Sequence, residues 1–109
     1  MHLFKDSLFN LKRLQVLDLS QNKIDMQMAL PIKDLVAGHH QLKNLHLRNC
    51  EIDERGIKVI CQAISMSETL ECLDLSNSYI RQESLPHLFE MVRKNQSLTG
   101  LIFRQIHLG

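Results

Sequence analysis

The sequence predicts an α/β solenoid, a horseshoe segment with a parallel β-sheet on its concave face and helices on its convex face. Three observations lead to this prediction. One eleven-residue segment recurs at a constant spacing of 28 residues, with copies starting at Leu14, Leu42, Leu70 and Leu98. Inside each copy the apolar residues alternate with period two, which is typical of a strand. Between the copies they recur at the spacing of an amphipathic helix.

Each copy is expected to form a half-buried strand. In the first copy, LQVLDLSQNKI, Leu17 and Leu19 alternate with outward-facing residues, so both side chains should point into the core. A further apolar residue, Ile24, closes the copy. The equivalent core positions in the other copies are Leu45, Leu47 and Ile52, then Leu73, Leu75 and Ile80, and finally Leu101, Phe103 and Leu108.

The segment after each strand is predicted to be a helix on the outer side. The clearest case follows Asp53, a residue type suited to capping, where one helical face carries Ile57, Ile60 and Ile64. Pro31 and Pro86 are expected near helix starts, where a missing N–H is tolerated. The same register predicts the inward-facing residues Ala29, Ile32, Leu35 and Val36 in the first repeat and Leu85, Leu88, Met91 and Val92 in the third.

The chain is expected to be a single leucine-rich domain, residues 1–109, of about three and a half repeats. Residues before Leu14 match the rear half of a repeat, with Phe4 and Leu8 at core positions, and no helix follows Leu108. Solenoids need polar terminal units to cover their outermost apolar faces. We therefore expect a piece of a longer array, or an array whose ends are covered by other chains.

The charge balance, the apolar stretches and the cysteines argue against several classes of function. The chain has 13 basic and 12 acidic residues and a formal net charge of +1, so it offers no cationic excess for binding nucleic acid. Its apolar stretches are only a few residues long, which argues against a membrane span or a secretory signal. The three cysteines, Cys50, Cys61 and Cys72, form no Cys-x-x-Cys pair, so reduced thiols in a cytoplasmic protein are expected.

The 28-residue period, the LxxLxLxx(N/C)xL segment and the helix start Asp53-Glu54-x-Gly56-Ile57 resemble the ribonuclease-inhibitor-like leucine-rich repeats, over essentially the whole chain. The resemblance implies a leucine-rich-repeat solenoid. Members of that family serve as enzyme inhibitors, GTPase activators, innate-immune sensors, actin regulators and ciliary scaffolds. The turn position that is usually Asn or Cys in this architecture is occupied here by Asn22, Cys50, Ser78 and Ile106.

Candidate binding residues lie at the outward positions of the predicted strands and turns. Equivalent residues of neighbouring repeats should stand about 4.8 Å apart and form rows across the concave face. Position five of the copies reads Asp18, His46, Asp74 and Ile102. Position seven reads Ser20, Arg48, Ser76 and Arg104, and position eight reads Gln21, Asn49, Asn77 and Gln105. The predicted partner-binding set is all of these residues except Ile102 and Gln105.

His46 is the centre of this prediction. A carboxylate on either side, from Asp18 and Asp74, favours the charged imidazolium form. Together with Arg48 and Arg104, His46 would give the face alternating charge, which suits an extended protein partner carrying both signs. The alternative is that these are solvated polar side chains, since exposed ion pairs contribute little.

Two kinds of active site are disfavoured. Ser20 or Ser76 lies diagonally from His46 with a carboxylate nearby, but no glycine-framed nucleophile turn accompanies either serine. A metal site could be drawn from Asp18, His46 and Asp74, with Cys72 near. The ligand types are suitable, but parallel strands direct these side chains outward instead of toward one point. We therefore expect no catalytic residue, no metal and no cofactor.

The sequence thus predicts a non-enzymatic scaffold that binds a protein partner through the concave strand face. Two alternatives stay open. One is a structural subunit of a large cytoskeletal or ciliary assembly that docks through uncapped repeat edges. The other is a regulator of a small GTPase.

Overall fold

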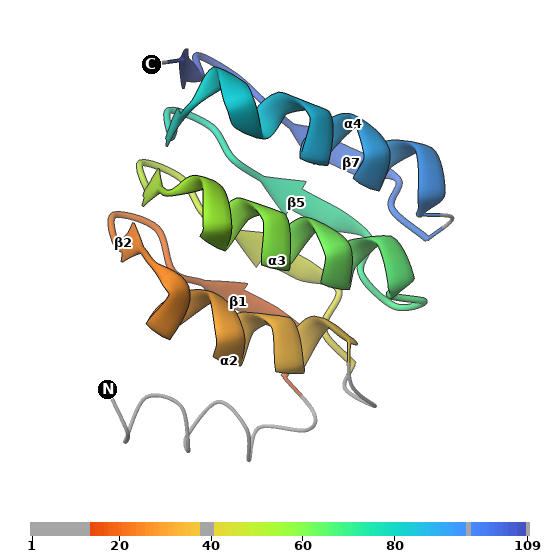
Figure 1. The fold of residues 1–109 in the computed structure, drawn as a ribbon. Helices are drawn as coiled ribbons and strands as arrows, with labels where there is room; N and C mark the ends of the chain where they lie inside the picture. The colour runs from red at the N-terminus through yellow and green to blue at the C-terminus, as the bar shows by residue number, and fades with distance from the viewer. Residues whose placement is uncertain (1–13, 38–40, 96, 109) are drawn as a thin grey trace.

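A computed structural model describes residues 14–37, 41–95 and 97–108, and the half repeat predicted around Phe4 and Leu8 lies outside them. Short strands alternate with helices on a repeating plan (Figure 1). The first two repeats contain β1 (Val16–Asp18), β2 (Lys23–Ile24) and α2 (Met26–Ala37), then β3 (Asn44–His46), β4 (Glu51–Ile52) and α3 (Glu54–Met66). The third contains β5 (Cys72–Asp74), β6 (Tyr79–Ile80), the 3₁₀ turn η1 (Gln82–Ser84) and α4 (Leu85–Lys94), followed by β7 (Gly100–Ile102) and β8 (His107–Leu108).

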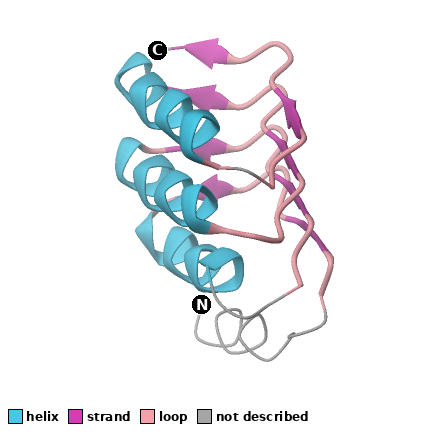
Figure 2. Ribbon diagram, turned by 90° about the vertical axis from the view of Figure 1, so that its right-hand side faces the viewer, coloured by secondary structure: helices cyan, strands magenta, loops and turns pink. Residues whose placement is uncertain are grey.

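The strands form two four-stranded parallel sheets. One has the order β1-β3-β5-β7 and the other β2-β4-β6-β8, so each repeat adds one strand to each sheet. The helices stack in a layer on the side opposite the first sheet (Figure 2). One such unit cannot bury its apolar side alone, and stacking the units creates a continuous core. The architecture is the predicted α/β solenoid.

The register of the first sheet confirms the predicted row at position five. Asp18 pairs with His46 across β1 and β3, and His46 pairs with Asp74 across β3 and β5. The last pair of this row joins Asp74 to Ile102. Residues that are far apart in the sequence therefore lie on neighbouring strands of one surface.

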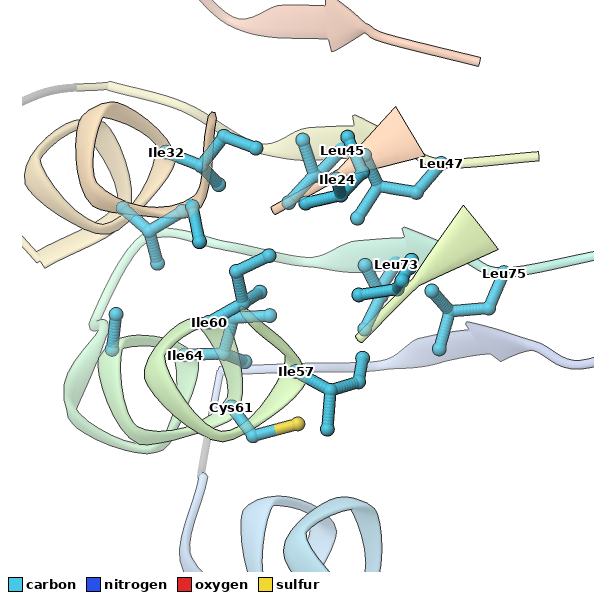
Figure 3. Close-up of a cluster of buried hydrophobic side chains, with 14 of the residues drawn as sticks. Ile24, Ile32, Leu45, Leu47, Ile57, Ile60, Cys61, Ile64, Leu73 and Leu75 are labelled. Atoms are coloured by element: carbon cyan, nitrogen blue, oxygen red, sulfur yellow. The ribbon is translucent and has the colours of Figure 1, made fainter. Parts of the chain in front are cut away.

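The core lies between the helices and the two sheets (Figure 3). Its strand residues Leu45, Leu47, Leu73 and Leu75 are at most 1% exposed. Burial of each such side chain contributes about 1.5–3 kcal/mol to folding, so this layer is the main source of stability. The helix residues that are buried as predicted are Ala29, Ile32, Leu35, Val36, Ile57, Ile60, Ile64, Leu88 and Met91.

Each of the first two helices that the structure describes begins directly after an aspartate. Asp53 caps α3 as predicted, because its Oδ1 accepts a hydrogen bond from the Gly56 N–H at 2.7 Å. Asp25 has the equivalent role before α2, where its Oδ1 accepts from the Met28 N–H at 3.2 Å. Each carboxylate satisfies an amide that the helix leaves without an internal partner.

The third repeat has Arg81 at this register position, and its side chain offers no acceptor. The Ser84 N–H bonds to the Arg81 carbonyl at 2.9 Å within η1, and α4 begins only at Leu85. Pro86 then lies in the first turn of α4, as predicted. The prediction for Pro31 was wrong: it lies inside α2, because the Asp25 cap starts that helix five residues earlier.

Four residues predicted to belong to the core are exposed instead. Nothing among the described residues follows β8 to cover this end of the stack. The exposed fractions are 49% for Val92, 38% for Leu101, 38% for Phe103 and 46% for Leu108. One repeat earlier, the following repeat covers the equivalent residues, which are at most 2% exposed: Ile64, Leu73, Leu75 and Ile80.

Candidate functional site

The predicted binding residues lie on the outward surface of β1, β3, β5 and β7 and of the turns that follow these strands, here called the strand face. This face contains a cavity of about 600 Å³. The lining comes from three successive repeats and consists of Asp18, Ser20, Gln21, Arg48, Asn49 and Asn77. The structure therefore gathers six of the predicted residues around one polar hollow.

Arg48 joins the three repeats that form this cavity. Its Nη2 lies 3.8 Å from Asp18 Oδ2, and its Nε lies 3.6 Å from Asp74 Oδ2. Its backbone N–H donates to Ser20 Oγ at 3.0 Å. The guanidinium side chain stays half exposed, at 51%. Arg48 is therefore oriented by its neighbours while remaining open to a partner.

Asp74 and Ser76 are buried, at 5% and 7% exposure, although the rows were predicted to face solvent. Asp74 Oδ1 accepts from the Ser76 N–H at 3.0 Å, and Oδ2 lies 3.8 Å from His46 Nδ1. The carboxylate lies in the middle of the sheet, where the side chains of His46 and Arg48 on the adjacent repeat pack against it. A partner would meet His46 and Arg48 before it met Asp74.

The surroundings of Asp18 and Asp74 favour the ionised form of both carboxylates. Hydrogen bonds from the Ser20 side chain and backbone lower the pKa of Asp18, with a smaller effect of the positive charge on Arg48. Burial acts to raise the pKa of Asp74, but hydrogen bonds from Ser76 and the charge of Arg48 outweigh it, so this pKa also lies below its ordinary value. The strand face thus keeps fixed negative charge beside Arg48 at neutral pH.

The turn residues of position eight have a backbone role that the sequence analysis did not foresee. All four have positive φ, between 53° and 67°: Gln21, Asn49, Asn77 and Gln105. Bonds between neighbouring turns hold this left-handed backbone, since the Gln21 N–H donates to the Arg48 carbonyl at 2.8 Å and the Asn49 N–H to the Ser76 carbonyl at 3.0 Å. The backbone conformation at the rim of the cavity is therefore held by hydrogen bonds between stacked repeats.

Asn22, Cys50 and Ser78, which occupy position nine of the first three copies, bond the turn backbone. Asn22 Nδ2 donates to the Leu19 carbonyl at 2.8 Å, and Cys50 Sγ contacts the same oxygen at 3.3 Å. One repeat later, Ser78 Oγ donates to the Leu47 carbonyl at 2.5 Å. These bonds fix the turn that carries each outward residue of positions seven and eight.

Arg104 lies at the far end of its row, away from the cavity. It is exposed, and within the described residues it makes no ion pair. The four candidates outside the cavity lining therefore differ in environment. Asp74 contacts both His46 and Arg48, and the Ser76 N–H donates to Asp74. Arg104 makes none of these contacts.

Among the described residues, no serine or cysteine is activated as a nucleophile. Among the hydrogen bonds of the described chain, none joins a serine to His46, and Ser20 Oγ is occupied by the Arg48 N–H. Burial raises the pKa of the Cys61 thiol to about 12, and burial together with Asp74 raises the pKa of Cys72. Both thiols are therefore protonated and weakly reactive at neutral pH.

No group of three or more His, Cys, Asp or Glu residues in the described ranges is arranged to hold a metal ion. The parallel strands place Asp18, His46 and Asp74 side by side. Across the same ranges, the structure has no helix with the length and apolarity needed to cross a bilayer.

Sequence reasoning missed a second outward row, on the sheet formed by β2, β4, β6 and β8. Its register joins Lys23, Glu51, Tyr79 and His107. The rings of Tyr79 and His107 stack with centroids 4.5 Å apart, and both line a cavity of about 380 Å³. The 28-residue offset that revealed the first rows would have revealed this one as well.

The comparisons with known proteins agree with this architecture. The Leucine Rich Repeat family model matches residues 13–35 and 69–91. Leucine-rich repeat-containing protein 45 of Gallus gallus is 25% identical over 93 residues, covering 85% of this chain and 14% of that protein. NACHT, LRR and PYD domains-containing protein 4C of Mus musculus is 32% identical over 82 residues, covering 75% of this chain and 8% of that protein. The chain spans only a small part of these relatives.

A solved structure gives the same result for the fold. Leiomodin-1 Actin-Binding Site 2 (ABS2) superposes with a TM-score of 0.76 over 93% of this chain and 60% of that chain. The two sequences are only 16% identical, so the likeness concerns the fold alone.

Proposed function

Because the chain folds as a leucine-rich-repeat solenoid, we propose that it is a non-enzymatic interaction module that binds a protein partner through its strand face. The observation that carries this proposal is the polar cavity of about 600 Å³ whose lining is shared by three repeats. A surface assembled by stacking is fixed before a partner arrives, which lowers the ordering cost of binding.

The partner that fits this surface is an extended protein segment with both acidic and basic side chains. Arg48 is half exposed and flanked by Asp18, so one segment can meet a cation and an anion within a few ångströms. The amide side chains of Gln21 and Asn49 at the exposed rim can both donate and accept hydrogen bonds. Rim contacts of this kind set orientation and specificity more than affinity.

The decisive experiment compares two charge reversals. Arg48→Glu changes the centre of the cavity, whereas Arg55→Glu makes the same chemical change on the exposed surface of α3. We expect Arg48→Glu to reduce capture of the partner from native lysate at least tenfold and Arg55→Glu to leave it unchanged. Equal capture by Arg48→Glu and the unaltered chain would contradict the proposal.

A second candidate function has its own observation. The elements α4, β7 and β8 lie at one end of the stack (Figure 1). Apolar side chains of these elements and of the turn after β7 are exposed there. They are Phe89, Val92, Leu101, Phe103 and Leu108, here called the end face. Exposed apolar surface of this kind, beside β7 and β8 at the ends of the two described sheets, favours docking into a larger structural assembly.

The end-face candidate predicts a different response to mutation. Phe89→Asp combined with Leu108→Asp should abolish association with an assembly and leave the circular dichroism spectrum of the folded chain unchanged. Sedimentation of each variant with the captured partner measures this. If binding survives the end-face changes but is lost in Arg48→Glu, the strand face is the docking site.

We also propose that the repeats are of the ribonuclease-inhibitor-like kind and that the protein works in the cytoplasm. The two-strand and one-helix plan of each described repeat supports the first point. The free thiols of Cys50, Cys61 and Cys72 support the second.

A further inference from the structure

The two ring nitrogens of His46 have different surroundings. Nδ1 is buried and has no hydrogen-bond partner within the described residues. The imidazole side chain is 27% exposed overall. Because Nδ1 is the enclosed atom, Nε2 is the nitrogen that solvent or a partner can reach. A buried polar atom without a partner is uncommon in folded proteins, so its environment needs an explanation.

The enclosed nitrogen faces a fixed carboxylate. Nδ1 lies 3.8 Å from Asp74 Oδ2, and the Asp74 side chain is only 8% exposed. Asp74 cannot turn away freely, because its Oδ1 accepts the Ser76 N–H at 3.0 Å. Within the described part of the chain, no ion pair joins His46 to its other neighbour in the row, Asp18. The two carboxylates that flank His46 are therefore not equivalent.

The protonation of Nδ1 decides whether this contact is attractive. A lone pair on Nδ1 would point at an anion in a place that water does not reach, and the weak screening there makes that repulsion strong. A proton on Nδ1 turns the same contact into a favourable one. The neutral imidazole has one N–H, and the bond made by one nitrogen fixes the state of the other.

From this geometry we propose that Asp74 holds neutral His46 in the Nδ1–H tautomer, so that Nε2 presents a hydrogen-bond acceptor at the centre of the strand face. Asp74 is thus a positioning residue for His46. The chemistry of the partner follows only if the proposed function holds: the group that meets Nε2 is an N–H or O–H donor, such as a backbone amide.

Protonation of His46 reverses this polarity. Both nitrogens then carry a proton, Nε2 becomes a donor, and the strand face gains one positive charge. The charged groups facing the ring are Asp18 and Asp74 on the neighbouring strands and Arg48 on its own repeat. Arg48 Nε lies 3.6 Å from the same Asp74 oxygen, so an added proton on His46 places two cations on one carboxylate. A doubly protonated His46 therefore disfavours an N–H donor of a partner and favours a partner carboxylate.

The experiment reads the tautomer directly in the full chain. Long-range proton–nitrogen correlation spectra of histidine-labelled protein, recorded above the titration range of histidine, show which ring nitrogen carries the proton, and His46→Gln assigns the signal. We expect His46 to be mainly Nδ1–H. In Asp74→Ala it should change to the Nε2–H form that free histidine favours in water. Asp74→Asn keeps one oxygen for the Ser76 N–H and places its NH₂ donor in front of Nδ1, so it should also shift the ratio toward the Nε2–H form.

The matched control is Asp18→Ala, which removes the other flanking carboxylate and should leave the tautomer of His46 unchanged. His87 and His107 provide reference signals in the same spectra. An Nε2–H tautomer in the unaltered chain would overturn the inference, as would an equal ratio in Asp74→Asn and the unaltered chain if Asp74→Ala does not fold. The result does not depend on partner binding, so failure of the proposed function and failure of this inference are separate outcomes.

Discussion

The second and third repeats share one backbone plan but differ in what covers them. In α3, Cys61 and Ile64 are 2% and 0% exposed, because η1 and α4 pack against that helix. Their equivalents in α4, Phe89 and Val92, are 67% and 49% exposed. The two helices also begin differently, with a side-chain cap before α3 and none before α4.

This difference shows that burial in the solenoid depends on position in the stack as well as on residue type. Phe89 is larger and more apolar than Cys61, yet it is the exposed member of the pair. Stability should therefore be concentrated in the covered repeat, and the same kind of substitution should cost less at the end face. Four predictions test this contrast, beginning with the largest expected effect.

Ile64→Ala should lower the free energy of unfolding by about 3 kcal/mol, because it removes buried methyl groups and leaves a cavity. Val92→Ala, at the equivalent position one repeat later, should cost less than about 1 kcal/mol because the side chain is half exposed. Urea unfolding of the two variants measures both values. Equal costs would show that the end face is covered in solution.

Asp74→Asn should lower the free energy of unfolding by about 1.5 kcal/mol at neutral pH, because the ionised carboxylate accepts the Ser76 N–H and faces Arg48. The pKa of Asp74 in the folded state is below its ordinary value of 3.8. Its stabilisation is therefore complete above that pH and is lost as the pH falls through the folded-state pKa. Unfolding curves of the variant and the unaltered chain should converge as the pH falls through the folded-state pKa of Asp74. A difference in the free energy of unfolding that stays constant with pH would contradict a contribution from the ionised Asp74 carboxylate.

The helix starts predict two effects of opposite sign. Asp53→Ala should destabilise the chain by about 1 kcal/mol, because the Gly56 N–H loses its acceptor. Arg81→Asp should stabilise it by a similar amount, because it supplies the cap that the third repeat lacks. Thermal unfolding measures both shifts. A destabilising Arg81→Asp would mean that η1 is favoured for reasons other than the missing cap.

The smallest effect concerns the turns. Asn49 and Asn77 occupy the left-handed turn position in the second and third repeats, whereas Gln105 occupies it after β7. Asparagine tolerates this backbone better than glutamine does, so Gln105→Asn should stabilise the chain by a few tenths of a kcal/mol, roughly 0.3. Asn77→Gln should have the reverse effect in the same unfolding assay, and a gain in stability there would refute the explanation.

Most of the fold could be predicted from the sequence because the leucine register is repeated without insertion. A constant offset places Asp18 beside His46 and His46 beside Asp74 once the strands are parallel. The Asp53 cap could be predicted for the same reason, since a helix N-terminus needs an acceptor at a fixed place. These features depend on local chemistry and on the period.

The remaining features depend on neighbours that the period does not specify. The burial of Asp74 follows from the packing of His46 and Arg48 against it, which no offset predicts. The exposure of Leu101 and Phe103 follows from what covers the end of the stack, although their sequence pattern is that of core residues. The pattern identified the strand-face residues, and the structure was needed to show which of them a partner can reach.

The most direct test of the account is photo-crosslinking from the strand face to the captured partner. A photoreactive residue replaces Val16, which is 49% exposed on β1, and in a matched chain it replaces Gln62, which is exposed on α3. Binding through the strand face predicts strong crosslinking to the partner from position 16 and little from position 62. Crosslinking from position 62 alone would contradict it.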